Sequence, residues 1–185
     1  LSLGAHKCGG PKGVGALYIR EGVILHPLIS GGAQESHLRA GTENTPSIIG
    51  FAEASKVSVA NLSGEHRRLS QLREALWMEI SAAFSNFVRI TPETNARPNT
   101  LNVAVPGVDS RTLVAKLDEL GIACASGSAC TTHDPEPSHV LLAMGRGDLA
   151  RSALRFSFGA ESKAEDVAAI AQSLRTALPH TVAVK

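Results

Sequence analysis

The sequence predicts an α/β fold in which a small sheet is covered by helices on one face. Three patterns support this prediction. Apolar residues within 69–80 recur at helical spacing and form a stripe. Residues 100–105 and 154–158 alternate apolar and polar side chains, as half-buried strands do. Helices that precede and follow a few strands are typical of this arrangement.

The chain is expected to contain two parts. Residues 1–61 are rich in glycine and loops, with one predicted strand at 14–19. Near their end, Thr45 is expected to cap a helix whose first residue is Pro46. Residues 62–185 are predicted to form a self-contained α/β unit.

The elements of the second part follow from local patterns. After the helix at 69–80, strands are predicted at 87–90 and 100–105, and Cys124 is interpreted as part of a buried strand. Asp109 or Ser110 is expected to cap a helix whose apolar positions are Leu113, Val114, Leu117 and Leu120. Ser162 and Glu165 suggest a capping box for the last helix, whose apolar positions are Val167, Ile170, Leu174 and Leu178.

Composition excludes several classes of protein. The chain has 185 residues, a formal net charge of +1 and 4% aromatic residues, so a nucleic-acid-binding surface is not expected. It contains no apolar run of the roughly 20 residues that a membrane span needs. Three cysteines without a C-x-x-C pair make a poor disulfide framework, and a reducing cytoplasm is the expected location. Leu1 is expected to be an internal residue of a longer protein or the first ordered residue of an expressed piece, and no secretory signal is seen.

The first candidate site is Lys7, which follows His6 and precedes a glycine-rich run at 9–13. A lysine that forms a covalent link to a flat cofactor needs room, and glycines let the backbone pass close to a ring or a phosphate. The histidine can donate a hydrogen bond to a phosphate. Taken alone, the same pattern is more often an ordinary surface loop.

The second candidate is Cys130, which lies among small residues at 126–132 and before a polar segment with two prolines. That composition predicts an exposed loop. Because unpaired cysteines are usually buried, an exposed thiol suggests that its reactivity is used. The alternative is an incidental thiol.

Two further candidates are cationic. Arg155 alternates with apolar residues, so it points away from the core, and an arginine on a strand can hold a carboxylate with two parallel hydrogen bonds. Arg39 and Thr42 lie among glycines just before a helix start and could receive an anion. The alternatives are a solvated surface arginine and an ordinary turn. No metal site is expected, because the histidine and cysteine spacings fit no zinc pattern.

Together and in this order, the segments resemble a cysteine desulfurase, a pyridoxal-phosphate enzyme of fold type I. The long cysteine loop is similar to that of the branch that serves nitrogen fixation and iron–sulfur cluster assembly. Gly4 stands where the family often has a serine. The matching segments are AHK at 5–7, GPKGVGALY at 10–18, GGAQE at 31–35, LRAGT at 38–42, PNTLNV at 98–103, SGSACT at 126–131, EPSHVL at 136–141 and LRFSFG at 154–159.

The resemblance implies a role for each candidate. Lys7 would hold pyridoxal 5'-phosphate covalently and move the α-proton of the substrate. His6 would bind the cofactor phosphate, and Thr42 would reach the phosphate of the neighbouring subunit in a homodimer. Arg155 would hold the substrate carboxylate. Cys130 would attack the sulfur of L-cysteine, giving L-alanine and a persulfide on Cys130.

The resemblance also implies an architecture. Residues 1–61 would be the end of the large domain of a fold type I enzyme. Residues 62–185 would be a small C-terminal α+β domain with a short, mainly antiparallel sheet, and it would carry the cysteine loop. The family's first half supplies most cofactor contacts, so these 185 residues alone are not expected to be active. A sulfur-acceptor or iron–sulfur scaffold protein is the expected partner.

Two other readings stay open. One is a selenocysteine lyase or another fold type I enzyme, and the other is a non-catalytic dimerisation or binding module. Cys130 argues against a transaminase, which needs no such thiol.

Overall fold

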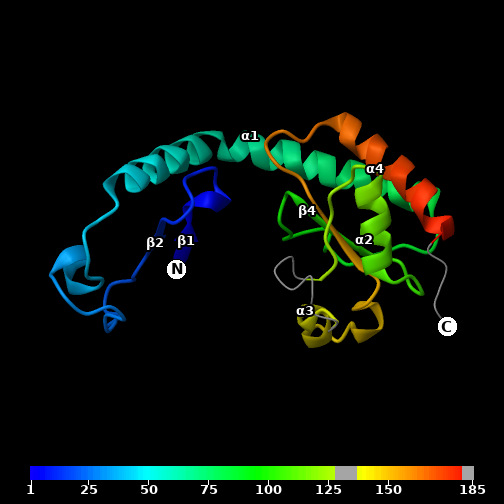
Figure 1. The fold of residues 1–185 in the computed structure, drawn as a ribbon. Helices are drawn as coiled ribbons and strands as arrows, with labels where there is room; N and C mark the ends of the chain where they lie inside the picture. The colour runs from blue at the N-terminus through cyan, green and yellow to red at the C-terminus, as the bar shows by residue number, and fades with distance from the viewer. Residues whose placement is uncertain (128–136, 181–185) are drawn as a thin grey trace. The chain divides into compact units, whose positions relative to one another are not determined.

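The computed structural model describes residues 1–127 and 137–180. The chain divides into two compact units, Leu1–Leu62 and Ser63–Lys185, whereas the boundary predicted from sequence lies after residue 61. One helix, α1 (Thr45–Ala83), runs through this boundary (Figure 1). No helix in the described part of the chain is long and apolar enough to cross a membrane.

The first unit begins with a two-stranded antiparallel sheet. It consists of β1 (Ser2–Gly4) and β2 (Gly15–Leu17), separated by a 3-10 turn, η1 (Ala5–Lys7). The strand predicted at 14–19 is therefore present but shorter, and β1 was not predicted. Gly15 is required here because a Cβ atom at this position would lie 2.6 Å from the carbonyl oxygen of Leu3.

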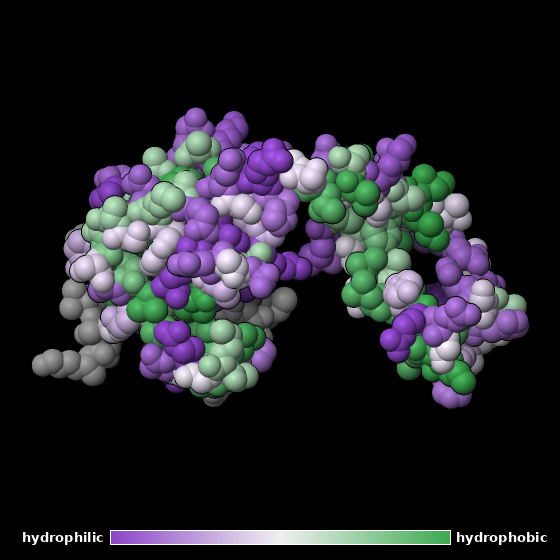
Figure 2. All heavy atoms as spheres, turned by 180° about the vertical axis from the view of Figure 1, so that it is seen from behind, coloured by the Kyte–Doolittle hydropathy of each residue, from purple (hydrophilic) through white to green (hydrophobic). Residues whose placement is uncertain are grey.

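Much of the apolar surface of the first unit is exposed. Leu28 is 99% exposed and Ile24 is 84% exposed, and Figure 2 shows hydrophobic residues at the surface. A second 3-10 turn, η2 (Gln34–His37), leads toward α1. Of the buried hydrophobic residues in the described chain, only Ala5 and Ala40 belong to this unit.

Helix α1 begins at Thr45, but Thr45 is not its cap. The side-chain oxygen of Asn44 accepts a hydrogen bond from the amide of Ser47, and the carbonyl of Asn44 accepts one from the amide of Ile48. The prediction was wrong by one residue, since asparagine caps helices at least as well as threonine. The 69–80 stripe lies on the same helix, where Leu76 and Ile80 are fully buried.

The second unit contains a three-stranded antiparallel sheet in the order β3-β4-β5. Its strands are β3 (Val88–Arg89), β4 (Thr100–Ala104) and β5 (Ala153–Ser157). This confirms the predicted α/β class with a mainly antiparallel sheet. The remaining elements are α2 (Ser110–Glu119), α3 (His139–Ala143), η3 (Gly147–Leu149), α4 (Ala164–Ala177) and η4 (Leu178–His180).

Each face of this sheet packs against its own cluster of apolar side chains. The larger cluster joins Leu101, Val103, Leu154 and Phe156 of the sheet to apolar residues of α1, α2 and α4. The opposite face carries a smaller cluster that joins Ala104 and other sheet residues to α3 and η3. The sequence predicted helices on one face only, and the second cluster is a finding of the structure.

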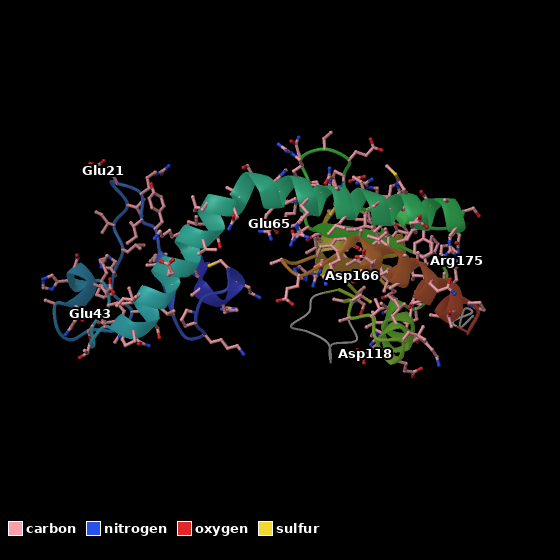
Figure 3. The ribbon with its side chains drawn as sticks, turned by 90° about the horizontal axis from the view of Figure 1, so that it is seen from above. Glu21, Glu43, Glu65, Asp118, Asp166 and Arg175 are labelled. Atoms are coloured by element: carbon pink, nitrogen blue, oxygen red, sulfur yellow. The ribbon has the colours of Figure 1, made fainter. Side chains whose placement is uncertain are left out.

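Capping residues fix two of the helices. The Asp109 carboxylate accepts a hydrogen bond from the amide of Thr112, as predicted for α2. The predicted capping box at Ser162 was wrong by one residue, because the Asp166 carboxylate accepts from the amide of Lys163, while the Ser162 hydroxyl oxygen accepts from Gly159. Asp166 in the first turn of α4 and Arg175 in its last turn complement the helix dipole (Figure 3).

The predicted strand around Cys124 is also absent. Residues 122–124 are not in a strand, although Cys124 packs against the larger cluster. Only the next residue, Ala125, forms an isolated antiparallel bridge, and its partner is Arg155.

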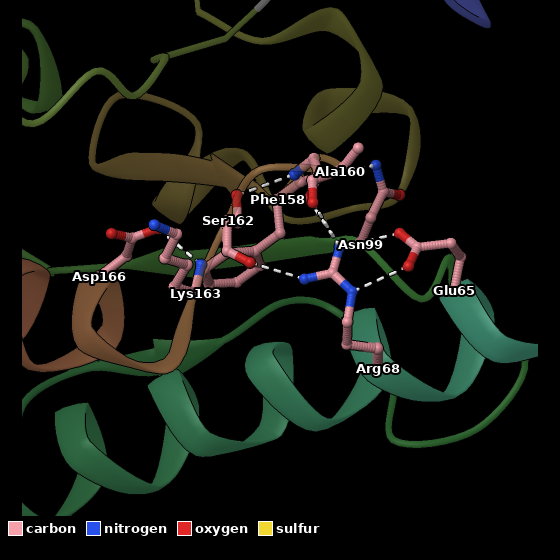
Figure 4. A network of polar contacts seen from close by, with 9 residues as sticks. Glu65, Arg68, Asn99, Phe158, Ala160, Ser162, Lys163 and Asp166 are labelled. Carbon is pink, nitrogen blue, oxygen red and sulfur yellow. Dashed lines mark hydrogen bonds and ion pairs between the residues drawn. The ribbon is translucent and has the colours of Figure 1, made fainter.

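Arg68 ties α1 to the turn between β5 and α4 (Figure 4). Its guanidinium donates to the carbonyls of Ser162 at 2.6 Å, Gly159 at 2.9 Å and Ala160 at 3.2 Å. The Glu65 carboxylate holds the same group from one helical turn away, at 2.8 Å. Three backbone carbonyls of the turn are therefore satisfied by one side chain.

A second charged group lies between α1 and β3. The Glu74 carboxylate accepts from Arg89 at 2.6 Å and from Arg73 at 2.8 Å. Both arginine side chains are largely buried, and the guanidinium of Arg89 lies 5.7 Å from the ring centre of Trp77. Hydrogen bonds from Arg89 and then from Arg73, against the opposing effect of burial, hold the pKa of Glu74 below its ordinary value.

We predict that Glu74→Gln destabilises the second unit by about 1–3 kcal/mol at pH 7, because two guanidiniums lose a charged acceptor. Since the pKa of Glu74 is lowered on folding, its contribution is complete above the unfolded pKa of about 4.3 and is lost as pH falls through the folded pKa. Urea denaturation of wild type and variant at pH 7, 5 and 3 measures this. A difference that stays constant down to pH 3 would contradict the assignment.

Candidate active site

Lys7 ends a tight turn that the fold holds closely. The carbonyl of Ala5 accepts hydrogen bonds from the amides of Cys8 at 3.0 Å and Gly10 at 2.9 Å, and the amide of Ala5 donates to Val14. Ala5 itself is fully buried. A Cβ atom at Gly10 would lie 3.0 Å from that of Ala5, so the glycine permits the turn to close.

The side chains of His6 and Lys7 are both exposed beside this turn. Among the residues that the structure describes, neither side chain has a hydrogen bond or an ion pair. An amine and an imidazole are therefore exposed next to each other on a backbone turn that the hydrogen bonds and burial of Ala5 hold in place. This arrangement suits a covalent link to an aldehyde at Lys7 and a hydrogen bond to an anion at His6.

The segment around Thr42 is ordered by its own contacts. The amide of Gly41 donates to the side-chain oxygen of Gln34 at 3.2 Å, and the amide of Ala40 donates to Ile29. Arg39, which was expected to help receive an anion, donates one hydrogen bond to the carbonyl of Ala40 at 2.7 Å.

Upstream of Thr42 the backbone is strained. Glu35, Ser36 and His37 have φ values of 50°, 55° and 65°. Such left-handed conformations cost about 1–3 kcal/mol each in non-glycine residues, and they cluster at ligand sites and switch regions. Thr42 itself is exposed, and no hydrogen bond or ion pair in the described chain joins it to His6 or Lys7.

Arg155 lies in the second unit, on the side of the sheet opposite the larger cluster. Its neighbours Leu154 and Phe156 are buried in that cluster, so alternation turns Arg155 to the other face, as the sequence predicted. One guanidinium nitrogen donates to the carbonyl of Gly127 at 3.2 Å. No carboxylate in the described residues forms an ion pair with Arg155.

A cavity of about 250 Å³ lies beside Arg155. The sheet contributes Asn102, Ala153 and Arg155 to its walls, and α3 contributes apolar residues that include Leu141. Gly127 and Ser138 also line it, so the cavity is reached by both described ends of the segment that contains Cys130. Cys130 itself lies outside the described residues.

The other two cysteines differ from the expected nucleophile. Burial, together with the nearby Asp118 carboxylate, raises the pKa of the Cys124 thiol to about 11, so it stays protonated and unreactive near neutral pH. Cys8 donates its thiol hydrogen to the carbonyl of Ala5 at 3.2 Å. Cys124 is thus half-buried and unreactive, although the strand predicted around it is absent.

Sequence reasoning missed Asn102 as a polar residue of the cavity. The signal was present, because Asn102 lies between Leu101 and Val103 in an alternating strand and must face the same side as Arg155. It was not used because the alternation at 100–105 was interpreted only as evidence for a half-buried strand. Among the described residues, no group of three or more histidine, cysteine or acidic side chains is arranged to hold a metal.

Comparison with known proteins places these features in a family. The family model for aminotransferase class-V matches residues 1–170. The chain is 39% identical over 97% of its length to the cysteine desulfurase IscS of Dictyoglomus turgidum, and 44% identical over 90% of its length to a cysteine desulfurase of Gluconacetobacter diazotrophicus. It covers 48% and 42% of these proteins, so it spans about half the length of the curated relatives it matches.

A solved structure gives the same result for the fold. A NifS-like protein superimposes with a TM-score of 0.84 and 37% identity, covering 97% of this chain and 46% of that protein. The turn at Lys7, the Arg155 strand and the matched sequence thus lie within one family alignment. The chain belongs to the aminotransferase class-V family, and the curated relatives named above are cysteine desulfurases.

Proposed function

We propose that this chain supplies half of a cysteine desulfurase, which converts L-cysteine to L-alanine and leaves the sulfur as a persulfide on Cys130. The observation that carries the proposal is the cavity that Arg155, without a carboxylate partner in the described chain, shares with Gly127 and Ser138, which lie on either side of the Cys130 segment in the sequence. The relatives' names support the same reaction. Below, the full-length enzyme means this chain together with the residues that its relatives have in addition.

The two units would have separate tasks. Residues 1–61 would complete the large, cofactor-binding domain, and residues 62–185 would form the small domain that carries the cysteine loop. The exposed apolar side chains of the first unit support this division, since the rest of a large domain would cover them. The dividing point between Leu62 and Ser63 is consistent with it.

The residues of the first unit fit pyridoxal 5'-phosphate. Lys7 offers an amine without a partner in the described chain for the cofactor aldehyde, and His6 offers a donor for its phosphate. Thr42 would donate its hydroxyl hydrogen to the phosphate bound by the other subunit of a homodimer. When bound, the cofactor supplies an electron sink for the charge that develops on the substrate carbon.

The chain's own residues would perform the remaining steps. Arg155 holds the substrate carboxylate, and the Lys7 amine takes the α-proton. The Cys130 thiolate then attacks the substrate sulfur, so that a sulfur–sulfur bond forms and the carbon–sulfur bond breaks. The electron pair of the broken bond stays with the carbon fragment, which gains protons and leaves as alanine. One thiol and one cysteine thereby become one persulfide and one alanine.

The persulfide would pass to a sulfur-acceptor or iron–sulfur scaffold protein in the cytoplasm. A cysteine on a loop can carry sulfur from the cofactor to a partner, which a thiol such as the half-buried Cys124 cannot do. A selenocysteine lyase would bind the carboxylate of its substrate at Arg155 and use Lys7 in the same way. Comparing turnover of cysteine with turnover of selenocysteine therefore separates the two activities. A non-catalytic dimerisation or binding module would need neither Lys7 nor Cys130.

We predict that Cys130→Ala in the full-length enzyme abolishes sulfide release from cysteine but keeps the visible absorbance of the bound cofactor. Cys130 accepts sulfur and does not bind the cofactor ring, so only the transfer is lost. Cys124→Ala is the matched control and should keep the activity, because its thiol stays protonated. Normal sulfide release by the Cys130 variant would rule out the proposed nucleophile.

We further predict that borohydride reduction of the cofactor-loaded enzyme, followed by peptide mapping, places the pyridoxyl group on Lys7. Lys12 is the nearest competitor, since it is also exposed and lies in the same glycine-rich run. Lys7→Ala should lose the label and Lys12→Ala should keep it. A label on Lys12 in the wild-type enzyme would show that the turn at Ala5–Lys7 has another role.

A further inference from the structure

Asn102 and Arg155 are direct neighbours across the sheet. The register of β4 and β5 pairs Asn102 with Arg155, between the buried pairs Leu101 with Phe156 and Val103 with Leu154. Opposed residues of an antiparallel pair have Cβ atoms about 4.5–5.5 Å apart on the same face. Both residues line the cavity of about 250 Å³.

The polar groups of Asn102 differ in how they are satisfied. Its backbone amide donates to the Thr91 hydroxyl at 2.6 Å, and its backbone carbonyl accepts from the backbone amides of Ile90 at 2.9 Å and Thr91 at 3.1 Å. Its side-chain oxygen is screened from solvent and has no hydrogen-bond partner among the described residues. A buried acceptor without a partner costs about 1–3 kcal/mol, so a donor is expected at this atom.

The size and the lining of the cavity restrict which ligand could donate a hydrogen bond to Asn102. Its volume is below the about 300–1,000 Å³ of pockets that hold drug-sized ligands, which suits a ligand as small as an amino acid. Arg155 offers donors and attracts a carboxylate, whereas the Ser138 oxygen already accepts from the amide of Leu141. Asn102 lines the same cavity, so a donor group next to the bound carboxylate would lie close to its side chain.

We propose that Asn102 is a substrate-positioning residue whose side-chain oxygen accepts a hydrogen bond from the α-amino group of the amino acid that Arg155 holds by its carboxylate. This inference rests on the proposed function. Cysteine carries two donors near its carboxylate, the α-ammonium and the thiol. The ammonium is charged and donates strongly, whereas a thiol is a weak donor, so the contact goes to the amino group.

The contact acts when the substrate arrives. It orients the amino group of the amino acid whose carboxylate Arg155 holds. Loss of the contact should therefore raise KM for cysteine and leave kcat nearly unchanged, because an interaction made equally with the bound substrate and in the transition state contributes to binding alone.

The test uses the full-length enzyme and three competitive inhibitors of cysteine turnover. Alanine has the carboxylate and the amino group, 3-mercaptopropionate has the carboxylate and the thiol, and propionate has the carboxylate only. Asn102→Leu should raise the inhibition constant of alanine about tenfold, the loss expected for one hydrogen bond to a charged group, and leave the other two unchanged. Arg155→Lys should raise all three.

Two further variants serve as controls. Asn102→Asp keeps an acceptor but adds a charge that competes for Arg155, so it should weaken propionate more than alanine even where Asn102→Leu fails to fold. Asn99→Leu removes an amide of the same segment that is not among the cavity's lining residues and already donates to Phe158, and it should change none of the three constants.

The outcomes separate the two claims. An Asn102→Leu enzyme that binds alanine normally, or that loses all three inhibitors equally, would overturn the role of Asn102. A selective loss of 3-mercaptopropionate would do the same, because it would assign the contact to the thiol. If Arg155→Lys changes no constant, or the wild-type enzyme does not consume cysteine, the proposed function fails instead.

Discussion

The pairing of β4 with β5 is the constraint on which the second unit depends. In this register Leu101 and Val103 face the same side as Leu154 and Phe156, and all four are almost completely buried in the larger cluster. Because side chains alternate along a strand, the same register places Asn102 and Arg155 together on the opposite face. A shift of one residue would expose the core and remove the arginine from the cavity. The core and the candidate substrate site are therefore specified by one pairing.

That pairing also explains why the sheet face that carries Arg155 is not fully covered by apolar packing. Ala104 and Ala153 are small, and together with α3 and η3 they form only the smaller cluster. The remaining space beside Arg155 is the cavity. The backbone bridge between Ala125 and Arg155 joins β5 to the segment whose Gly127 lines this cavity. Apolar packing beside a charged group in a small space favours a small ligand with a carboxylate, since the guanidinium then gains a charged partner.

Periodic patterns predicted most of the second unit. The stripe on α1, the alternation of β4 and β5 and the Asp109 cap each depend on neighbouring residues, so they could be read from the sequence. Caps at Thr45 and Ser162 were misplaced by one residue. Asn44 accepts from the amide of Ser47, Asp166 accepts from the amide of Lys163, and only the folded geometry decides between such neighbouring residues. The short strand β1 and the packing of α3 depend on distant partners, and no local pattern marks them. Lys7, His6, Thr42 and Arg155 were candidates from local patterns and took their specific roles from a family resemblance, whereas the cavity that joins Arg155 to Asn102 needed the strand register.

The central claim is that the face of the sheet bearing Arg155 binds the carboxylate of an amino acid. A crystal structure of the full-length enzyme with the product alanine bound tests it most directly. We expect the carboxylate of alanine on the guanidinium of Arg155, within the cavity that Gly127 and Ser138 border. A carboxylate bound elsewhere, with Arg155 still donating to the Gly127 carbonyl, would contradict the account.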